Sequence, residues 1–382
     1  MKKMKIVMAT DYPIGGEKID GGVQAVSSYI VNGLKKIEEV DLSIITFRSN
    51  ISEPEEAIED GIRIHVLPRA KRGGNLTFYR SDFKSFMACV NQIKPDLIHA
   101  QDASVEGYLA SKSGYPSMVT FHGMISEDAK YRATFKDRMR FRLISWIAER
   151  YCVKSPNPKI LISPYVKRHY GDRLKGKCVH IPNPIKNKFY EVVRQEEPGR
   201  ILYAGKLIRR KGITDLIQAL GTLDKSLEFK LFLAGALNDE AYVNQIKLLI
   251  KQLKLEDRVE FLGLINETQI LEEFSKASML VLPSYQETAP MVIQQAMAAK
   301  VAVAATRICG VPDQLENGDC GLLFEAGDIE GCRQQIHKLI TDQEFRNNLV
   351  ERAYIKAKNT FYADKVVAET VDFYKSVLGW SP

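Results

Sequence analysis

The chain has 382 residues, of which 45% are hydrophobic and 26% are charged, and its formal net charge is +7 at pH 7. This length allows two domains of ordinary size, and the composition is typical of a globular protein and excludes a disordered or fibrous one. No run approaches the roughly 18 uncharged apolar residues that a membrane-spanning helix needs, and the very short apolar run at the start favours a buried strand over a signal peptide.

The first element is an apolar strand at 5–9, followed by a glycine-rich loop that ends in Gly21-Gly22. A helical pattern begins at about Val23 and ends at about Leu34. Glycine lets the backbone approach an anion closely, so the loop either contacts a phosphate or forms a mobile turn. The fingerprint G-x-G-x-x-G is absent, which counts against a dehydrogenase or epimerase built on Rossmann-like halves.

Strand-like and helical patterns then alternate. The strand-like runs lie at 42–47, 62–67, 96–100 and 117–121, with helical patterns at about 77–93 and 103–113. This alternation predicts a parallel sheet covered by helices on both faces. His122 directly follows one strand, where it is either a satisfied loop histidine or a group that faces the ligand crevice.

The segment 131–154 is predicted to be one helix that mixes basic with apolar and aromatic residues. These residues are Arg132, Phe135, Lys136, Arg138, Met139, Arg140, Phe141, Arg142, Leu143, Trp146, Ile147, Arg150 and Lys154. The mixture is typical of a helix at an anionic membrane surface, or of a packed helix with a solvated basic face. No known nucleic-acid-binding module accompanies it, so nucleic acid is not an expected partner.

Strand-like runs at 160–163 and 178–181 precede Pro182-Asn183-Pro184, which breaks regular structure and indicates a linker. A second alternating series starts at 201–204. The loop after that strand carries four cations, Lys206, Arg209, Arg210 and Lys211. Clustered cations after a strand either neutralise a diphosphate or form a solvated charge run. The remaining predicted strands lie at 229–235 and 259–262, and the helices at about 213–220, 240–253, 266–275, 328–340, 343–358 and 364–378.

The stretch 283–324 combines the features of a ligand site. An apolar strand at 277–282 ends in Pro283-Ser284, Glu287 follows on the loop, and a helix is expected to start at 288–290. The unpaired N–H groups of that start, at Met291 and Val292, suit an anion. Gln295 lies eight residues after Glu287, so both can face one cleft. The plainer reading is a capping acid and a surface amide.

One pattern in this stretch consists of P-S-x-x-E, then a polar residue after seven further residues, then A-M-A and, later, G-V-P-D. This pattern resembles the signature of the retaining glycosyltransferases of family 4. The likeness extends over nearly the whole chain. It implies the α/β fold called GT-B, with two Rossmann-like domains facing each other across a deep cleft. The acceptor-binding domain would be 1–181, with the helix at about 364–382 packed back onto it, and the nucleotide-sugar-binding domain would be 182–363.

The resemblance also implies residue roles. The catalytic group would be Glu287, His122 and Lys211, and the nucleotide-sugar-binding group would be Gly21, Gly22, Lys206, Lys211, Met291, Val292 and Gln295. Two residues depart from the family pattern. Lys206 replaces an Arg and offers a point charge instead of a planar fork. Gln295 replaces a Glu and keeps hydrogen bonding to the ribose without the charge-assisted bond.

The expected reaction is therefore retaining transfer from a UDP- or GDP-sugar to a glycan or lipid-linked acceptor, in bacterial surface polysaccharide or glycolipid synthesis. Neither D-x-D nor metal-ligand spacing occurs, so no metal and no other cofactor is expected. Scattered cysteines favour a cytoplasmic protein, peripheral at the inner face of the membrane if the basic helix binds there. The alternatives are a catalytically weakened nucleotide-sugar-binding protein of the same fold, and a peripheral membrane protein that acts through its basic helix.

Overall fold

The computed structural model describes residues 3–17, 19, 21–70, 74, 77–132 and 134–380, and it divides into two compact units. Unit 1 comprises the chain up to Pro184 together with the segment from Ala363 onward. Unit 2 is the continuous segment Ile185–Tyr362. The chain therefore enters and leaves unit 2 once each, and unit 1 is completed only by its final helix.

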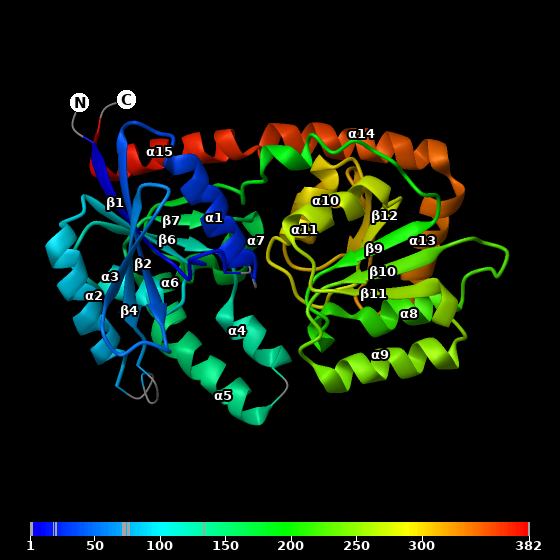
Figure 1. Ribbon diagram of the computed structural model, residues 1–382, viewed down its shortest axis with the longest axis horizontal. Coiled ribbons are helices and arrows are strands. Elements are labelled where there is room, and N and C mark those ends of the chain that lie inside the picture. Colours follow the sequence, from blue (N-terminus) through cyan, green and yellow to red (C-terminus); the bar gives the residue numbers. More distant parts are fainter. Residues whose placement is uncertain are drawn as a thin grey trace. The chain divides into compact units, whose positions relative to one another are not determined.

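Unit 1 is built on an eight-stranded sheet with the strand order β3-β4-β2-β1-β5-β6-β7-β8. Strands β1, β2, β4, β6 and β7 of this sheet are labelled in Figure 1. The strands are β1 (Met4–Ala9), β2 (Val40–Arg48), β3 (Glu55–Glu59), β4 (Ile62–Pro68), β5 (Leu97–Gln101), β6 (Ser117–Phe121), β7 (Lys159–Leu161) and β8 (Cys178–His180). Every neighbouring pair is parallel except β3 and β4. The central strands β5 and β6 are buried along their whole length, as their apolar runs predict.

The α-helices among the described residues of unit 1 accompany this sheet. They are α1 (Gly22–Leu34), α2 (Arg80–Ile93), α3 (Val105–Lys112), α4 (Ile125–Asp128), α5 (Phe135–Ile144), α6 (Arg150–Lys154), α7 (Pro164–Tyr170) and α15 (Ala363–Leu378). Helix α15 packs on α1 so closely that a Cβ at Gly33 would lie 2.3 Å from the Val367 side chain. The last two residues of the predicted range 364–382 lie outside the described residues.

The segment predicted as one helix over 131–154 differs from that prediction in two ways. The α-helix begins at Phe135, because the Thr134 side chain accepts a hydrogen bond from the Asp137 N–H at 3.0 Å and caps the first turn. It then passes through a π-helical segment (Ser145–Glu149) before continuing as α6. No helix of the described residues is both long enough and apolar enough to cross a membrane.

Unit 2 contains a six-stranded, fully parallel sheet with the order β11-β10-β9-β12-β13-β14. Its strands are β9 (Arg200–Ala204), β10 (Lys230–Ala234), β11 (Val259–Gly263), β12 (Met279–Leu282), β13 (Ala302–Thr306) and β14 (Leu322–Phe324). Its α-helices are α8 (Ile213–Gly221), α9 (Glu240–Gln252), α10 (Glu267–Lys276), α11 (Met291–Ala298), α12 (Val311–Gln314), α13 (Ile329–Thr341) and α14 (Gln343–Thr360).

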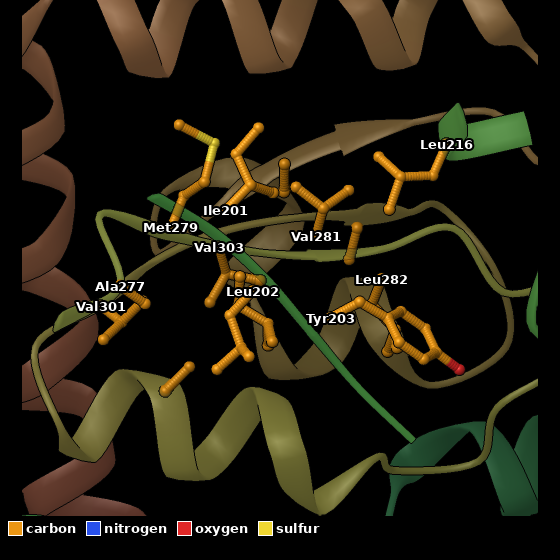
Figure 2. Close-up of a cluster of buried hydrophobic side chains, with 14 of the residues drawn as sticks. Ile201, Leu202, Tyr203, Leu216, Ala277, Met279, Val281, Leu282, Val301 and Val303 are labelled. Atoms are coloured by element: carbon orange, nitrogen blue, oxygen red, sulfur yellow. The ribbon is translucent and has the colours of Figure 1, made fainter. Parts of the chain in front are cut away.

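The core of unit 2 lies between this sheet and its helices. Figure 2 shows apolar side chains of β9, β12 and β13 gathered there, among them Ile201, Leu202, Met279, Val281 and Val303. Burying each of these side chains stabilises the fold by about 1.5–3 kcal/mol. The core holds the carboxyl ends of β9 and β12 together, and the loops that leave those ends form the site.

Candidate active site

Glu287 is the centre of a polar cluster in unit 2. It lies on the loop between β12 and α11 and is only 6% exposed. Its Oε1 accepts a hydrogen bond from the Ser284 hydroxyl at 2.9 Å and forms an ion pair with the Lys211 ammonium group. The hydrogen bonds that Glu287 receives from described side chains both end on Oε1, and none ends on Oε2.

Lys211 reaches Glu287 because two loops meet closely. Gly212 has a φ of +64°, and a Cβ there would lie 2.1 Å from the Pro283 carbonyl oxygen, so only glycine fits. The Tyr285 N–H donates to the Arg210 carbonyl oxygen at 2.8 Å and ties the same loops together. The loop after β9 is thereby fixed against the loop after β12, with Lys211 beside Glu287.

The charge on Glu287 is set by two opposing effects. Burial alone would raise its pKa, but the charges of Lys211 and Arg210 and the hydrogen bonds from Lys211 and Ser284 outweigh burial, so the pKa lies below its usual value. Glu287 is therefore ionised at neutral pH. A buried carboxylate beside a partly buried ammonium group is a strong hydrogen-bond acceptor for ligand hydroxyl groups.

The other cations of this loop have separate surroundings. Lys206 is exposed, and its carbonyl oxygen accepts a hydrogen bond from the Tyr203 hydroxyl at 3.0 Å. Arg209 donates to the Gln245 amide oxygen at 3.0 Å. Arg210 donates to the Gln286 carbonyl oxygen at 3.1 Å, and the close approach of the two loops partly buries its guanidinium group.

Helix α11 starts slightly later than the sequence indicates. Pro290 is its N-cap, with extended backbone, and Met291 is the first helical residue. A proline N-cap has no side-chain acceptor, so no side chain caps the N–H groups of Met291 and Val292. Gln295 lies two-thirds of the way along the helix and is partly buried, and its side chain makes no hydrogen bond to any described residue. Gln294 beside it is fully buried.

The remaining predicted site residues lie in unit 1. Gly21 is the N-cap of α1 and Gly22 its first residue. A Cβ at either glycine would meet nothing within 4 Å, and the φ of Gly21 is −177°, so neither packing nor backbone geometry requires glycine at these positions. Open backbone at a helix start is accessible to a ligand anion.

His122 follows β6, and its Nε2 lies 2.7 Å from the Gln101 amide oxygen. Burial lowers the pKa of His122 to about 4, although a hydrogen bond with the Asn183 side chain acts in the opposite direction. The imidazole is therefore neutral at physiological pH. A neutral imidazole has one donor and one acceptor nitrogen and can hydrogen-bond a sugar hydroxyl.

The structure thus brings Glu287 and Lys211 into contact within unit 2, and it places Gly21, Gly22 and His122 in unit 1. Ser284 is the partner that the sequence analysis missed, although it belongs to the P-S-x-x-E pattern, three residues before Glu287. Among the described residues, no group of three or more His, Cys, Asp or Glu side chains is placed to hold a metal ion.

Comparison with known families is consistent with this arrangement. The model described as Glycosyltransferase Family 4 matches residues 20–188, and the one described as Glycosyl transferases group 1 matches residues 185–356. An uncharacterized glycosyltransferase of Methanocaldococcus jannaschii is 26% identical over 355 residues, covering 91% of this chain and 92% of the relative. An α-1,4-N-acetyl-D-galactosaminyltransferase of Campylobacter jejuni that acts on an undecaprenol-linked glycan is 24% identical, covering 89% and 91%.

Solved structures share the fold at low sequence identity. Sucrose-phosphate synthase from Thermosynechococcus elongatus has a TM-score of 0.82 at 19% identity, covering 99% of this chain and 100% of that one. Anabaena HepE in complex with UDP-glucose has a TM-score of 0.73 at 18% identity, covering 97% and 100%. Two α/β units with these neighbours show the GT-B fold. The chain belongs to the glycosyltransferases of family 4, which confirms the resemblance seen in the sequence.

Proposed function

We propose that this glycosyltransferase uses a UDP- or GDP-sugar and moves the sugar, with retention of configuration, to a glycan or lipid-linked acceptor. The single observation that carries the proposal is the ion pair of partly buried Lys211 with buried Glu287 at the carboxyl ends of β9 and β12, with Oε2 of Glu287 receiving no hydrogen bond from the described residues. Ligands of open α/β sheets bind at this edge, where strands end and helices begin.

In the proposed site, Glu287 accepts hydrogen bonds from the hydroxyl groups of the donor sugar. Lys211 has three N–H donors and Glu287 occupies one, so the others face the diphosphate together with Lys206. The N–H groups of Met291 and Val292 add donors for the same anion, and Gln295 binds the ribose. Gly21 and Gly22 approach the donor phosphate, and His122 lies beside the transferred sugar.

Bond breaking leaves negative charge on the nucleoside diphosphate. Fixed cations and helix N–H groups stabilise that charge without reorganising, so the proposed reaction needs no metal ion. In the retaining reaction, the acceptor hydroxyl attacks on the face from which the diphosphate departs, and its proton passes to a phosphate oxygen. Surface polysaccharide or glycolipid synthesis is the proposed setting. A capsular polysaccharide biosynthesis glycosyltransferase of Staphylococcus aureus is 24% identical over 197 residues, half of each chain.

The test measures binding and turnover separately. We expect UDP or GDP to raise the melting temperature with and without EDTA, since a ligand at 100 times its Kd adds about 2.7 kcal/mol of stability. Glu287→Gln should keep nucleotide binding and lower transfer at least about 100-fold, as removal of one transition-state electrostatic contact typically does. The matched control is Lys230→Met, which breaks an exposed ion pair with Glu260.

Other outcomes separate the alternatives. Nucleoside diphosphate binding without transfer to any of several acceptors would support a catalytically weakened nucleotide-sugar-binding protein. A stability gain that EDTA abolishes would overturn metal independence. A stability gain with NAD alone would overturn the nucleotide-sugar proposal altogether.

We also propose that α5 and the following π-helical segment rest on an anionic membrane at the cytoplasmic face, because this stretch exposes apolar and basic groups together. None of the residues Phe135–Ile144, all of which the structure describes, is buried. Phe135, Met139 and Trp146 are 74%, 46% and 56% exposed. Membrane affinity is increased both by insertion of the apolar side chains and by attraction of the neighbouring arginines to anionic lipid.

Liposome flotation tests this second proposal. The wild type should float with vesicles containing phosphatidylserine and not with purely zwitterionic vesicles. Exchange of Arg138, Arg140 and Arg142 for Gln should abolish flotation, while the same exchange at Arg333, a partly exposed arginine of α13 paired with Glu330, should not. Flotation that survives the triple exchange would overturn the proposal.

A further inference from the structure

Tyr285 lies on the loop after β12, directly after Ser284 and two residues before Glu287, and it is partly buried. Its hydroxyl donates a hydrogen bond to Oδ2 of Asp215, which lies in the first turn of α8. A hydroxyl that donates to a carboxylate makes a stronger bond than one that donates to a neutral acceptor. The Tyr285 side chain therefore ties the loop that carries Glu287 to a helix that follows a different strand.

The same tyrosine contacts the chain on both sides of Lys211. Its N–H donates to the Arg210 carbonyl oxygen at 2.8 Å. A Cβ at Gly212 would lie 3.4 Å from Cε2 of the Tyr285 ring, so the ring lies against this glycine. Asp215 follows Lys211 by about one helical turn. One residue of the β12 loop thus contacts positions 210, 212 and 215, and Lys211 lies among them.

These contacts have separate roles. The bond from the Tyr285 N–H and the bond from the Arg210 guanidinium group to the Gln286 carbonyl oxygen do not depend on the Tyr285 hydroxyl, so loss of that hydroxyl should leave the two loops folded. The bond to Asp215 instead fixes the start of α8 relative to the loop. Helix α8 begins two residues after Lys211, so it sets the direction from which the Lys211 side chain approaches.

We propose that Tyr285 is a positioning residue, which holds Lys211 against Glu287 by binding Asp215. The inference rests on the proposed function, in which Lys211 faces the diphosphate and Glu287 faces the donor sugar. An ammonium group is a point charge on a flexible stem, without the planar fork that orients an arginine, so its place depends on the backbone that carries it. A displacement of about 1 Å in an active site can lower a rate roughly 100-fold.

The titration of Glu287 reports where Lys211 lies. Burial raises the pKa of Glu287, and the charges of Lys211 and Arg210 lower it to a greater extent. Tyr203 of β9 also faces Glu287, but burial and the charge of Glu287 raise the pKa of its phenol, so it stays neutral. Tyr285→Phe changes no charge. A shift of the Glu287 titration in this variant would therefore show that the cations have moved.

The groups that surround Asp215 do not interfere with this measurement. The Thr214 hydroxyl donates to Oδ1 of Asp215 at 3.4 Å. Burial and the charge of Asp215 raise the pKa of the Cys332 thiol of α13 and of the Tyr242 phenol of α9. None of these three groups ionises in the acid range where a carboxyl group titrates.

The experiment records ¹³C spectra of the side-chain carboxyl groups of the full chain as the pH is varied, with Glu287 assigned by the Glu287→Gln variant. Tyr285→Phe should move the Glu287 titration to higher pH, because a more distant Lys211 lowers the pKa less. The matched control is Tyr190→Phe, which removes a hydroxyl that donates to the Ala357 carbonyl oxygen of α14 at 2.9 Å. This control should leave the titration unchanged.

Kinetics supply the second readout. Tyr285→Phe should lower kcat/KM for the donor roughly 10- to 100-fold and move the acid limb of its pH profile upward together with the carboxyl titration. Asp215→Asn and Asp215→Leu remove the same charge, but only Asn keeps an oxygen that accepts from the Tyr285 hydroxyl. Asp215→Asn should therefore lose less activity than Asp215→Leu. Adding Tyr285→Phe to Asp215→Leu should cost little more, because the bond is already absent.

A folded Tyr285→Phe protein with the wild-type Glu287 titration overturns the inference, and so do equal losses in the two Asp215 variants. If Tyr285→Phe does not fold, the Glu287 titrations of Asp215→Asn and Asp215→Leu are compared instead, and identical titrations overturn the inference. The titration needs no substrate, so it decides the role of Tyr285 by itself. Full transfer activity in Glu287→Gln would overturn the proposed reaction and not the placement of Lys211.

Discussion

Ser284 helps to lower the pKa of Glu287, because the Ser284 hydroxyl donates to the same carboxylate oxygen that pairs with Lys211. Ser284→Ala removes one of the effects that lower the pKa of Glu287, so that pKa should rise. In the proposed reaction Glu287 acts in its ionised form, so the acid limb of the pH–rate profile should move to higher pH. Ser278→Ala, which removes a buried hydroxyl near the opposite end of β12, should not move it.

Gln295 offers a gain-of-function prediction. If it binds the ribose, Gln295→Glu replaces a neutral hydrogen bond with a charge-assisted one, about twice as strong. We expect the nucleoside diphosphate to bind roughly 5- to 10-fold more tightly, which corresponds to about 1–1.4 kcal/mol. Titration calorimetry on both proteins measures the difference. Equal affinities would place the ribose elsewhere.

Two histidines make unit 1 sensitive to acid. Burial lowers the pKa of His99 to about 3 and of His122 to about 4, whereas an unfolded histidine titrates near 6.5. Between pH 6.5 and 4 the unfolded chain therefore binds more protons than the folded one, and the free energy of unfolding falls as pH falls. The slope reaches about 1.4 kcal/mol per pH unit for each histidine. Denaturant titrations at pH 6.5 and 5 should show this loss, and His122→Gln should reduce it.

The contact between Glu287 and Lys211 joins two stretches that the sequence analysis singled out separately, the pattern at 283–313 and the cation cluster at 206–211. The pattern could not predict that Arg210 would contact Gln286, since that contact depends on how two loops fold together. It also could not predict the bond between His99 and Tyr374, which are 275 residues apart. Hydrogen bonds across such separations leave no periodicity in the sequence.

At the scale of elements, the loop that ends in Gly212 determines whether Lys211 meets Glu287. Gly212→Ala would place a Cβ 2.1 Å from the Pro283 carbonyl oxygen at a φ of +64°. The loop must then move away from β12, so we expect unit 2 to lose about 1–3 kcal/mol of stability and transfer to fall with it. Gly263→Ala is the matched control, since it has a similar φ of +68° but no atom within 4 Å of its Cβ. Equal stability losses in the two variants would mean that the approach to Pro283 is unimportant.

The strands of both sheets were mostly predictable, because a parallel strand covered on both faces is a continuous apolar run. Strand β3, with the sequence EEAIE, was missed. It pairs antiparallel with β4 at the edge of the sheet, where acidic residues remain in solvent and leave no apolar signal. The start of α5 was placed four residues too early for a related reason, since basic and apolar residues precede its Thr134 cap without a break in pattern.

At the scale of the whole molecule, unit 1 depends on a helix that follows unit 2 in the chain. Helix α15 buries Val366, Val367, Val371, Phe373 and Tyr374 in unit 1. At about 1.5–3 kcal/mol for each side chain, their removal costs as much as the entire stability of an ordinary domain. We expect a chain ending at residue 362 to lose the cooperative unfolding transition of unit 1, while unit 2 keeps its own. Differential scanning calorimetry distinguishes this from a simple loss of activity.

The bond between Tyr374 and His99 also sets the order of events during synthesis. A ribosome adding about 5–20 residues per second takes roughly 15–55 s to cover the 275 residues between them. Unit 2 is continuous, so it can close while unit 1 still waits for its last helix. A nascent chain can thus complete unit 2 first, and the bond between Tyr374 and His99 can form only after residue 374 has been added.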